Sequence, residues 1–240
     1  MAGPIPEERV SRPALCQRWQ SLTFLHWRYP PEEIQRLLPP GLVVDTFDGA
    51  AWLGLTPFLL VRMRPLCLPP VPRLSTFPET NLRTYVRDEA GTDGLWFFSL
   101  DVSSLATVLG ARSFFWVPYH WATMSVEEAG FVRYRSRRRG LSGPSPGHQI
   151  TVRPATPVLP ESHPPLVDFL TGRWRAFTRI AGRLAVVPVE HQPWPLYDAE
   201  VDELDEDVVA AAGLTPSEAA PFTHFSPGVD VRLGFPRPSR

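Results

Sequence analysis

The chain has 240 residues and a formal net charge of −1 at pH 7, with 43% hydrophobic and 20% charged residues. A chain of this length can bury a substantial core as one domain, and its near-zero net charge excludes a global attraction to DNA or to an anionic membrane. All 24 basic residues are arginines, so a Schiff base on a lysine amine is excluded. We therefore expect a small-molecule ligand and neither a nucleic-acid nor a membrane partner.

The first residues, the lack of a long apolar segment and the spacing of the cysteines predict a cytoplasmic protein. The first residues, MAGPIPEERVSRPALC, lack the apolar segment of a secretory signal, and no later segment approaches ~20 apolar residues. Cys16 and Cys67 lack metal-type or redox-type spacing, which predicts two free thiols. We expect a Pro-rich mobile segment over residues 1–15 and a single domain over 16–240.

The first elements in chain order are a strand, a short helix and a second strand. SLTFLHWRY (21–29) alternates in polarity, as strands do. PPEEIQRLLPPG (30–41) has prolines at its start and end and acidic residues early, which predicts a short helix. AAWLGLTPFLLVRM (50–63) is apolar enough for a buried strand, in which Pro57 marks a bulge or an edge.

A β-hairpin is predicted next, from TFPETNLRTYVR (76–87), the turn DEAGTDG and LWFFSLDVS (95–103). The remaining expected elements are strands over 111–127, 130–140, 147–156, 183–197 and 221–236, a helix over 163–180 interrupted by Gly172, and an acidic helix over 201–213. Proline accounts for 29 residues, so long helices are few. Together these elements predict a mainly β, antiparallel domain that forms a closed or nearly closed barrel.

The hairpin carries a polar stripe. A turn centred near Gly91 predicts the cross-strand pairs Arg83 with Ser99, Asn81 with Asp101, and Glu79 with Ser103, all on one face. Tyr85 and Phe97 share that face. Two interpretations remain open: the face meets bulk water, or it lines a ligand cavity in a small barrel.

Several motifs together resemble a known family across most of the chain. They are WRYPPEEIQRLLPPGL, GAAWLGLTPF, FPETNLRTYV, LWFFSLD, ARSFFWVPYHWATM and VEHQPWPL, in this order. The sequence resembles the YqjF-like family of uncharacterised proteins, which in turn is distantly similar to acetoacetate decarboxylase. That resemblance implies a cone-shaped antiparallel barrel around a mostly apolar cavity.

The resemblance to acetoacetate decarboxylase also implies where a site would lie. The positions that match the decarboxylase's catalytic segment are Arg112, Pro118, Tyr119 and His120, so its spacing is kept while its Schiff-base lysine is absent. A carboxylate near the decarboxylase site falls after an aromatic residue, and Phe77, Pro78 and Glu79 occupy the equivalent place. The resemblance therefore implies that Glu79 is a site carboxylate, but it does not imply an imine-forming mechanism.

Other clusters point to structure rather than chemistry. The six histidines lack metal-ligand spacing, so we expect no metal and no cofactor, and we interpret His26 and His191 as packed structural residues. The run RYRSRRRG (133–140) reads as a solvated basic edge strand, because DAEVDELDED (198–207) can offset its charge. The alternative, a phosphate-binding patch, is weaker.

The function predicted from sequence is binding of a small, partly apolar carbonyl or carboxylate compound in the barrel cavity. Glu79 is the candidate general acid or base, Tyr119 a hydrogen-bond donor, and Arg83 the anion anchor. In the empty site we expect Glu79 or Asp101 to pair with Arg83, so that Arg83→Met would strand a carboxylate and cost about 3 kcal/mol of stability. The other expected binding residues are Asn81, Asp101, Arg112 and His120. Any catalysis would be lysine-independent acid/base chemistry by a lyase, isomerase or hydrolase. The alternative is a non-catalytic ligand-binding or interaction module, and a homo-oligomer is left open.

Overall fold

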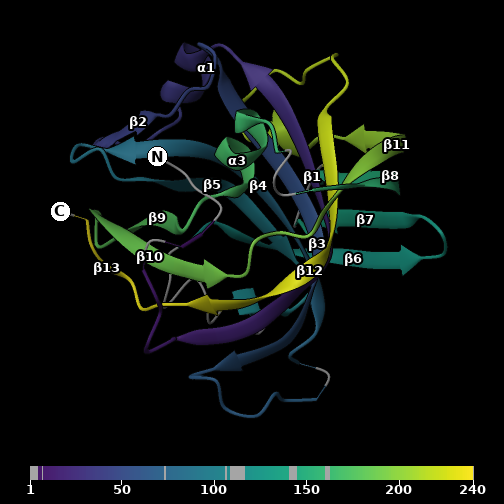
Figure 1. Cartoon of the computed structure of the whole chain (residues 1–240), viewed down its shortest axis with the longest axis horizontal. Helices are drawn as coiled ribbons and strands as arrows, with labels where there is room; N and C mark the ends of the chain where they lie inside the picture. Colours follow the sequence, from purple (N-terminus) through teal and green to yellow (C-terminus); the bar gives the residue numbers. More distant parts are fainter. Residues whose placement is uncertain are drawn as a thin grey trace.

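The computed structural model describes residues 5–6, 8–72, 74–105, 107–108, 117–140, 145–159 and 163–239 (Figure 1). Its strands are β1 (Leu15–Tyr29), β2 (Leu42–Val44), β3 (Ala51–Pro65), β4 (Phe77–Asp88), β5 (Asp93–Val102), β6 (Tyr119–Glu128), β7 (Val132–Arg138), β8 (Gly147–Val158), β9 (Arg175–Ile180), β10 (Arg183–His191), β11 (Leu196–Glu206), β12 (Phe222–Leu233) and β13 (Arg237–Pro238). Its helices are α1 (Pro31–Gln35), α3 (Pro165–Thr171) and α4 (Val208–Ala211).

These strands form one 13-stranded sheet that closes on itself twice, because β4 pairs with β5 and β10 pairs with β12. One closed circuit, the nine-strand barrel, runs β5-β6-β7-β8-β11-β12-β1-β3-β4. The other, the seven-strand barrel, runs β5-β9-β10-β12-β1-β3-β4. The predicted mainly β, closed-barrel fold is confirmed, and most pairings are antiparallel; β5 pairs in parallel with both β6 and β9.

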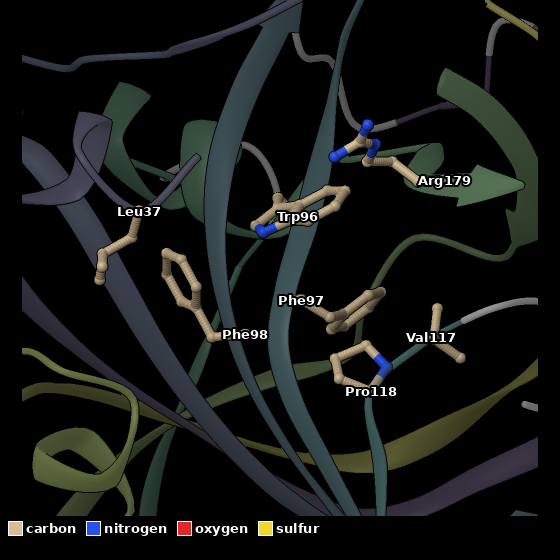
Figure 2. A pocket seen from close by; sticks show the side chains of 7 residues that line it. All are labelled: Leu37, Trp96, Phe97, Phe98, Val117, Pro118 and Arg179. Carbon is tan, nitrogen blue, oxygen red and sulfur yellow. The ribbon is translucent and has the colours of Figure 1, made fainter. Parts of the chain in front are cut away.

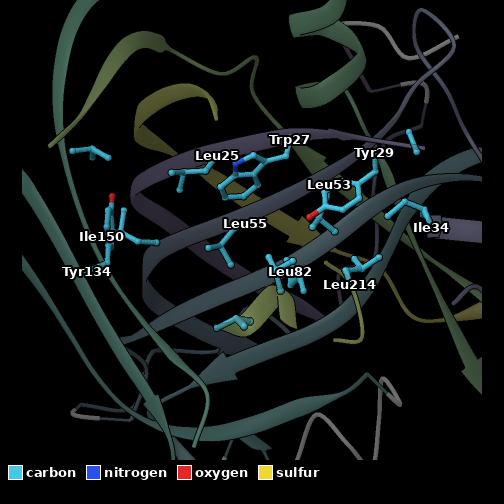
Figure 3. Close-up of a cluster of buried hydrophobic side chains, with 14 of the residues drawn as sticks. Leu25, Trp27, Tyr29, Ile34, Leu53, Leu55, Leu82, Tyr134, Ile150 and Leu214 are labelled. Carbon is cyan, nitrogen blue, oxygen red and sulfur yellow. The ribbon is translucent and has the colours of Figure 1, made fainter. Parts of the chain in front are cut away.

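Five strands, β12, β1, β3, β4 and β5, belong to both barrels, so each of their faces lines a different interior. Neighbouring residues of β1 show this, since Phe24 and Leu25 are both fully buried but lie in separate hydrophobic clusters. The cluster of the nine-strand barrel includes Leu55, Leu82 and Ile150 (Figure 3). Because both faces are covered, most residues of these strands are buried, including the polar ones of β4.

The short helices add side chains to both interiors. Ile34 of α1 and Val208 and Val209 of α4 join the cluster of the nine-strand barrel. Phe169 and Leu170 of α3 pack in another cluster with Trp52, Tyr85 and Leu95, on the side of the seven-strand barrel. None of the helices in the described part of the chain has the length and apolar character needed to span a bilayer.

Two helix predictions are wrong in part. The helix expected over 163–180 ends at Thr171, and Arg175–Ile180 forms β9, which pairs with β10 through a tight turn with positive φ at Ala181 and Gly182. The acidic helix expected over 201–213 is reduced to α4, because the preceding residues extend β11 along β8. In both places pairing with an existing strand outweighs local helix propensity.

The predicted irregularity at Pro57 is confirmed. The register between β1 and β3 shifts between the pair Gln20 with Leu59 and the pair Leu25 with Leu55, so Pro57 lies within the shifted segment. Proline lacks a backbone donor and is tolerated where the ladder is interrupted.

The prediction of two free thiols is wrong, because Cys16 and Cys67 form a disulfide. Cys16 lies opposite Arg64 in the β1–β3 ladder, and the chain turns back after Pro65, which brings the two Cα atoms to 5.0 Å. The 51-residue separation hides this proximity in the sequence. The bond ties the start of β1 to the loop between β3 and β4.

The arginine run does not form an edge strand, contrary to expectation. β7 lies between β6 and β8 and pairs with both. Its outward arginines face acidic and polar partners on neighbouring strands, such as Arg133 with Glu127 at 3.4 Å. The predicted charge compensation by the acidic segment also has a local counterpart, since Arg133 and Arg135 contribute to lowering the pKa of Glu203, after its hydrogen bonds from Gln149 and Thr151.

Candidate functional site

Three polar residues of β4 share the face that lines the seven-strand barrel. Glu79, Asn81 and Arg83 lie opposite Phe58, Thr56 and Gly54 of β3 in an uninterrupted register. Residues opposite one another in an antiparallel pair project to the same side of the sheet. The predicted common face of Glu79, Asn81 and Arg83 is therefore confirmed, and it points into the interior rather than to bulk water, since each residue is at most 7% exposed.

The cross-strand partners on β5 differ from the prediction. A bulge between Leu82 and Arg83 changes the register, so that Arg83 pairs with Phe97, whereas the partners of Asn81 and Glu79 are Leu100 and Val102. An extra residue in one strand shifts every later pair, which the turn sequence alone does not reveal. The polar stripe of β4 therefore faces apolar partners on β5.

Asp101 does not join this site, which corrects its predicted role. It pairs with Thr80 and faces the nine-strand barrel, where its two carboxylate oxygens accept hydrogen bonds from Arg138 Nε at 2.9 and 3.0 Å. His120 lies beside it in the β5–β6 register and shares that face. Burial raises the pKa of Asp101 to about 6, against the lowering effect of Arg138.

Glu79 is the buried carboxyl group of the site. It is 4% exposed, and Asn81 and Tyr119 both form hydrogen bonds with its carboxyl group. Its second oxygen, Oε2, has no hydrogen-bond partner among the described residues. Burial outweighs both hydrogen bonds and raises the pKa of Glu79 to about 8, so the group is mostly protonated at neutral pH.

Arg83 is a buried cation without a counter-ion among the described residues. Its guanidinium carbon lies 5.4 Å from the ring centroid of Phe24, and its Nε has no hydrogen-bond partner in the described part of the chain. It does contact the Tyr85 hydroxyl. The expected ion pair with Glu79 or Asp101 in the empty site is therefore wrong, and the guanidinium is left with unused donor capacity in a desolvated interior.

His26 and Tyr85 belong to this site, although the sequence suggested only packing for His26. His26 Nε2 lies 2.7 Å from the Tyr85 hydroxyl, which donates to the carbonyl of Leu170 at 2.8 Å. His26 Nε2 must then be the donor, which leaves Nδ1 as a buried acceptor with no partner among the described residues. Burial holds the pKa of His26 well below its usual value, so the ring is neutral.

Gly54 makes room for the histidine and the arginine. A Cβ built at this position would lie 3.1 Å from the His26 ring and 3.5 Å from Arg83 Cγ. The sequence did indicate that His26 lies two residues after Phe24 in a strand, so the two side chains share one face. Without the β1–β3 register, however, nothing connected His26 to Arg83.

Aromatic rings form the rest of the interior wall. The ring centroid of His191 lies 4.5 Å from Trp174, 4.6 Å from Trp194 and 6.0 Å from Trp19. Burial lowers the pKa of His191 to about 4. The interior therefore combines a few polar groups with an aromatic lining, the usual composition of a small-molecule site.

The contacts described above do not test the predicted role of Arg112 or the expected absence of a metal and a cofactor. Arg112 lies outside the described residues. Within the described ranges, no group of three or more His, Cys, Asp and Glu side chains is arranged to hold a metal ion. The expectation of a site without metal or cofactor stays a prediction.

Comparison with known proteins places the chain in a family. The DUF2071 family, described as an uncharacterized conserved protein, matches residues 16–230. The chain belongs to this family. It is also 35% identical over 216 residues to the "Uncharacterized protein YqjF" of Bacillus subtilis (strain 168), which covers 90% of this chain and 88% of that protein.

Solved structures confirm the barrel architecture. An acetoacetate decarboxylase from Legionella pneumophila is similar with a TM-score of 0.68 at 13% identity, covering 100% of this chain and 93% of that chain. An acetoacetate decarboxylase-like enzyme from Sphingomonas wittichii RW1 gives 0.62 at 13% identity, covering 98% and 96%. The enduracididine biosynthesis enzyme MppR complexed with pyruvate gives 0.63 at 14% identity, covering 97% and 93%. At these identities the likeness shows the fold.

Proposed function

We propose that the seven-strand barrel binds a small, partly apolar carbonyl compound that carries a carboxylate, with Arg83 as its anion anchor. The observation that carries this proposal is the buried guanidinium of Arg83, which has no anion beside it among the described residues. Burying an unpaired cation is costly, and a ligand carboxylate would supply the missing charge and hydrogen-bond acceptors. The aromatic walls suit the apolar remainder of such a compound.

The other polar groups suit the carbonyl end of the ligand. A protonated Glu79 can donate a hydrogen bond or a proton to a carbonyl oxygen, and after ionisation it can take a proton from the adjacent carbon. Tyr119 donates its O–H to the carboxyl group of Glu79 and so holds that group in place. Neutral His26, whose Nδ1 has no partner among the described residues, is a further acceptor in the same interior. These groups support acid/base chemistry that needs no lysine.

The fold neighbours make a keto acid a reasonable ligand class. Acetoacetate decarboxylase and the pyruvate complex of MppR share this barrel architecture. The absence of lysine in this chain removes imine formation but leaves carboxylate binding and proton transfer intact. A bound keto acid is therefore the first compound class to test.

Ligand binding is tested with a thermal-shift screen of pyruvate, acetoacetate and butanoate. A compound present at 100 times its Kd stabilises the folded protein by about 2.7 kcal/mol. Arg83→Met is expected to abolish that stabilisation, whereas Arg62→Met, which removes the same charge from an exposed side chain, is expected to retain it. Equal stabilisation of both variants would refute the assignment of Arg83.

A non-catalytic binding module is the second candidate, and the missing lysine favours it. Incubating a bound keto acid with the protein in D₂O separates the two possibilities, because general acid/base chemistry at Glu79 would exchange the proton beside the carbonyl. Deuterium incorporation that is lost in Glu79→Gln supports an enzyme. Binding without exchange supports the module.

A further inference from the structure

The sheet opens on one side of β5. β5 pairs with β9 at Leu95 and Trp96 and with β6 from Leu100 to Val102, so residues 97–99 lie between the two neighbouring strands. A groove of about 570 Å³ lies over this fork (Figure 2). We call it the aromatic groove; its lining residues are Leu37, Trp96, Phe97, Phe98, Val117, Pro118 and Arg179.

The aromatic groove is apolar except at one side. Of the seven described residues that line it, six are hydrophobic and Arg179 is the single charged one. Figure 2 shows Trp96 extending toward Arg179, with the ring of Phe97 beside Pro118. The Arg179 guanidinium donates to the carbonyl of Gly182 at 2.9 and 3.2 Å, so the turn between β9 and β10 holds this cation beside the groove.

The groove shares a wall with the interior site. Phe97 lies opposite Arg83 in the β4–β5 register and packs with the cluster that contains Tyr85. Pro118 directly precedes Tyr119, which contacts Glu79 inside the barrel. Because no strand pairs with β5 between β6 and β9 along the described residues, side chains rather than backbone ladder separate the groove from Arg83.

We propose that the aromatic groove is the outer half of the ligand site and binds the apolar tail of a monocarboxylate whose head reaches Arg83. This inference rests on the proposed function and narrows its ligand class to carboxylates with an alkyl or aryl tail. Continuity through Phe97 connects the groove to the buried cation, and the apolar lining matches a hydrocarbon tail. In this arrangement the Phe97 side chain lies between the two halves and has to move for a ligand to span them, while Arg179 is placed to attract the entering anion.

The test measures affinities for butanoate, hexanoate and octanoate by calorimetry. Each methylene that enters an apolar groove should strengthen binding by two- to fourfold, because burying one methylene contributes about 0.8 kcal/mol when complete. Octanoate is therefore expected to bind at least tenfold more tightly than butanoate. Octan-1-ol, which has the tail but no carboxylate, is expected to bind at least tenfold more weakly than octanoate.

Two matched variants locate the tail. Val117→Asp places a carboxylate in the groove and is expected to remove the dependence on chain length, while Val117→Leu is expected to retain it. Val43→Asp makes the same change at a residue that is 57% exposed on β2, away from the groove lining, and is expected to retain it too. The melting temperature of each variant shows whether it is folded.

The outcomes separate this inference from the proposed function. If all three acids bind with equal affinity and Arg83→Met abolishes binding, carboxylate binding at Arg83 is supported and the role of the aromatic groove is refuted. A chain-length dependence that survives Val117→Asp in a folded protein also refutes the groove. If Arg83→Met leaves every affinity unchanged, the proposed function itself fails.

Discussion

The buried carboxyl group of Glu79 gives the sharpest expectation, because its folded-state pKa governs a measurable pH dependence. The pKa rises from its usual 4.5 to about 8 in the folded protein, mainly through burial. Between these two values the folded chain binds more protons than the unfolded chain. The free energy of unfolding must therefore fall as pH rises through this window.

The magnitude follows from the two pKa values. The folded and unfolded pKa values differ by about 3.5, and each pKa unit corresponds to about 1.36 kcal/mol, so the total is about 5 kcal/mol. About 4 kcal/mol of this lies between pH 5 and pH 9. Glu79→Gln keeps the size and polarity of the side chain but removes the titration, so it lacks this loss of stability at high pH.

Urea unfolding of the native chain and of Glu79→Gln at pH 5 to 9 measures the effect. The difference in unfolding free energy should change in favour of the variant by about 4 kcal/mol as pH rises across this range. Subtracting the two curves cancels the titration of the buried histidines. The exposed Glu89→Gln variant controls for the loss of one charge, and a flat difference curve for Glu79→Gln would refute the buried, protonated state of this group.

Three further expectations follow from other contacts. Reduction of the Cys16–Cys67 disulfide, or Cys16→Ser, should lower the unfolding free energy by up to about 4 kcal/mol, because the bond closes a long loop; unchanged urea midpoints with and without reductant would contradict this. His148, whose pKa burial lowers to about 4, should cost stability as pH falls from 6.5 towards 4, by up to about 3 kcal/mol; a difference curve against His148→Gln that is flat in this window would show that the ring is solvated. Borohydride treatment with acetoacetate should trap no adduct within the barrel, and mass spectrometry of the treated chain detects any exception.

Side-chain alternation was sufficient to predict the polar face of β4. Glu79, Asn81 and Arg83 occur at every second residue, and the period of a strand places them together whatever their partners are. Cross-strand partners depend on register, and one bulge next to Arg83 moved Asp101 to the opposite face. The ion pair predicted between Arg83 and Asp101 failed for this reason, whereas Glu79 shares the face of Arg83 but forms its hydrogen bonds with Asn81 and Tyr119.

The revised surroundings of Arg83 also change its expected contribution to stability. The sequence suggested that Arg83→Met would strand a carboxylate and cost about 3 kcal/mol. Since no carboxylate contacts Arg83 among the described residues, the substitution removes an unpaired buried charge, and we expect the ligand-free variant to be at least as stable as the native chain.

Sharing of strands between two barrels could not be predicted from periodicity. Burial of both faces makes the first part of β3 almost continuously apolar, a pattern that also fits an ordinary buried strand, whereas β1 keeps buried polar residues such as Thr23 and His26. Closure of the seven-strand barrel requires β10 to pair with β12, a contact between segments whose sequences carry no mutual signal. The same closure brings His26 and His191 into the interior with Arg83.

A crystal structure with 3-(4-bromophenyl)propanoate tests the central claim most directly, because the anomalous signal of bromine locates the tail and electron density locates the carboxylate. Our account predicts the carboxylate within hydrogen-bonding distance of Arg83 inside the seven-strand barrel, with the ring directed toward Phe97. A carboxylate bound only at Arg138 or on the outer surface, with the guanidinium of Arg83 uncontacted, would contradict it.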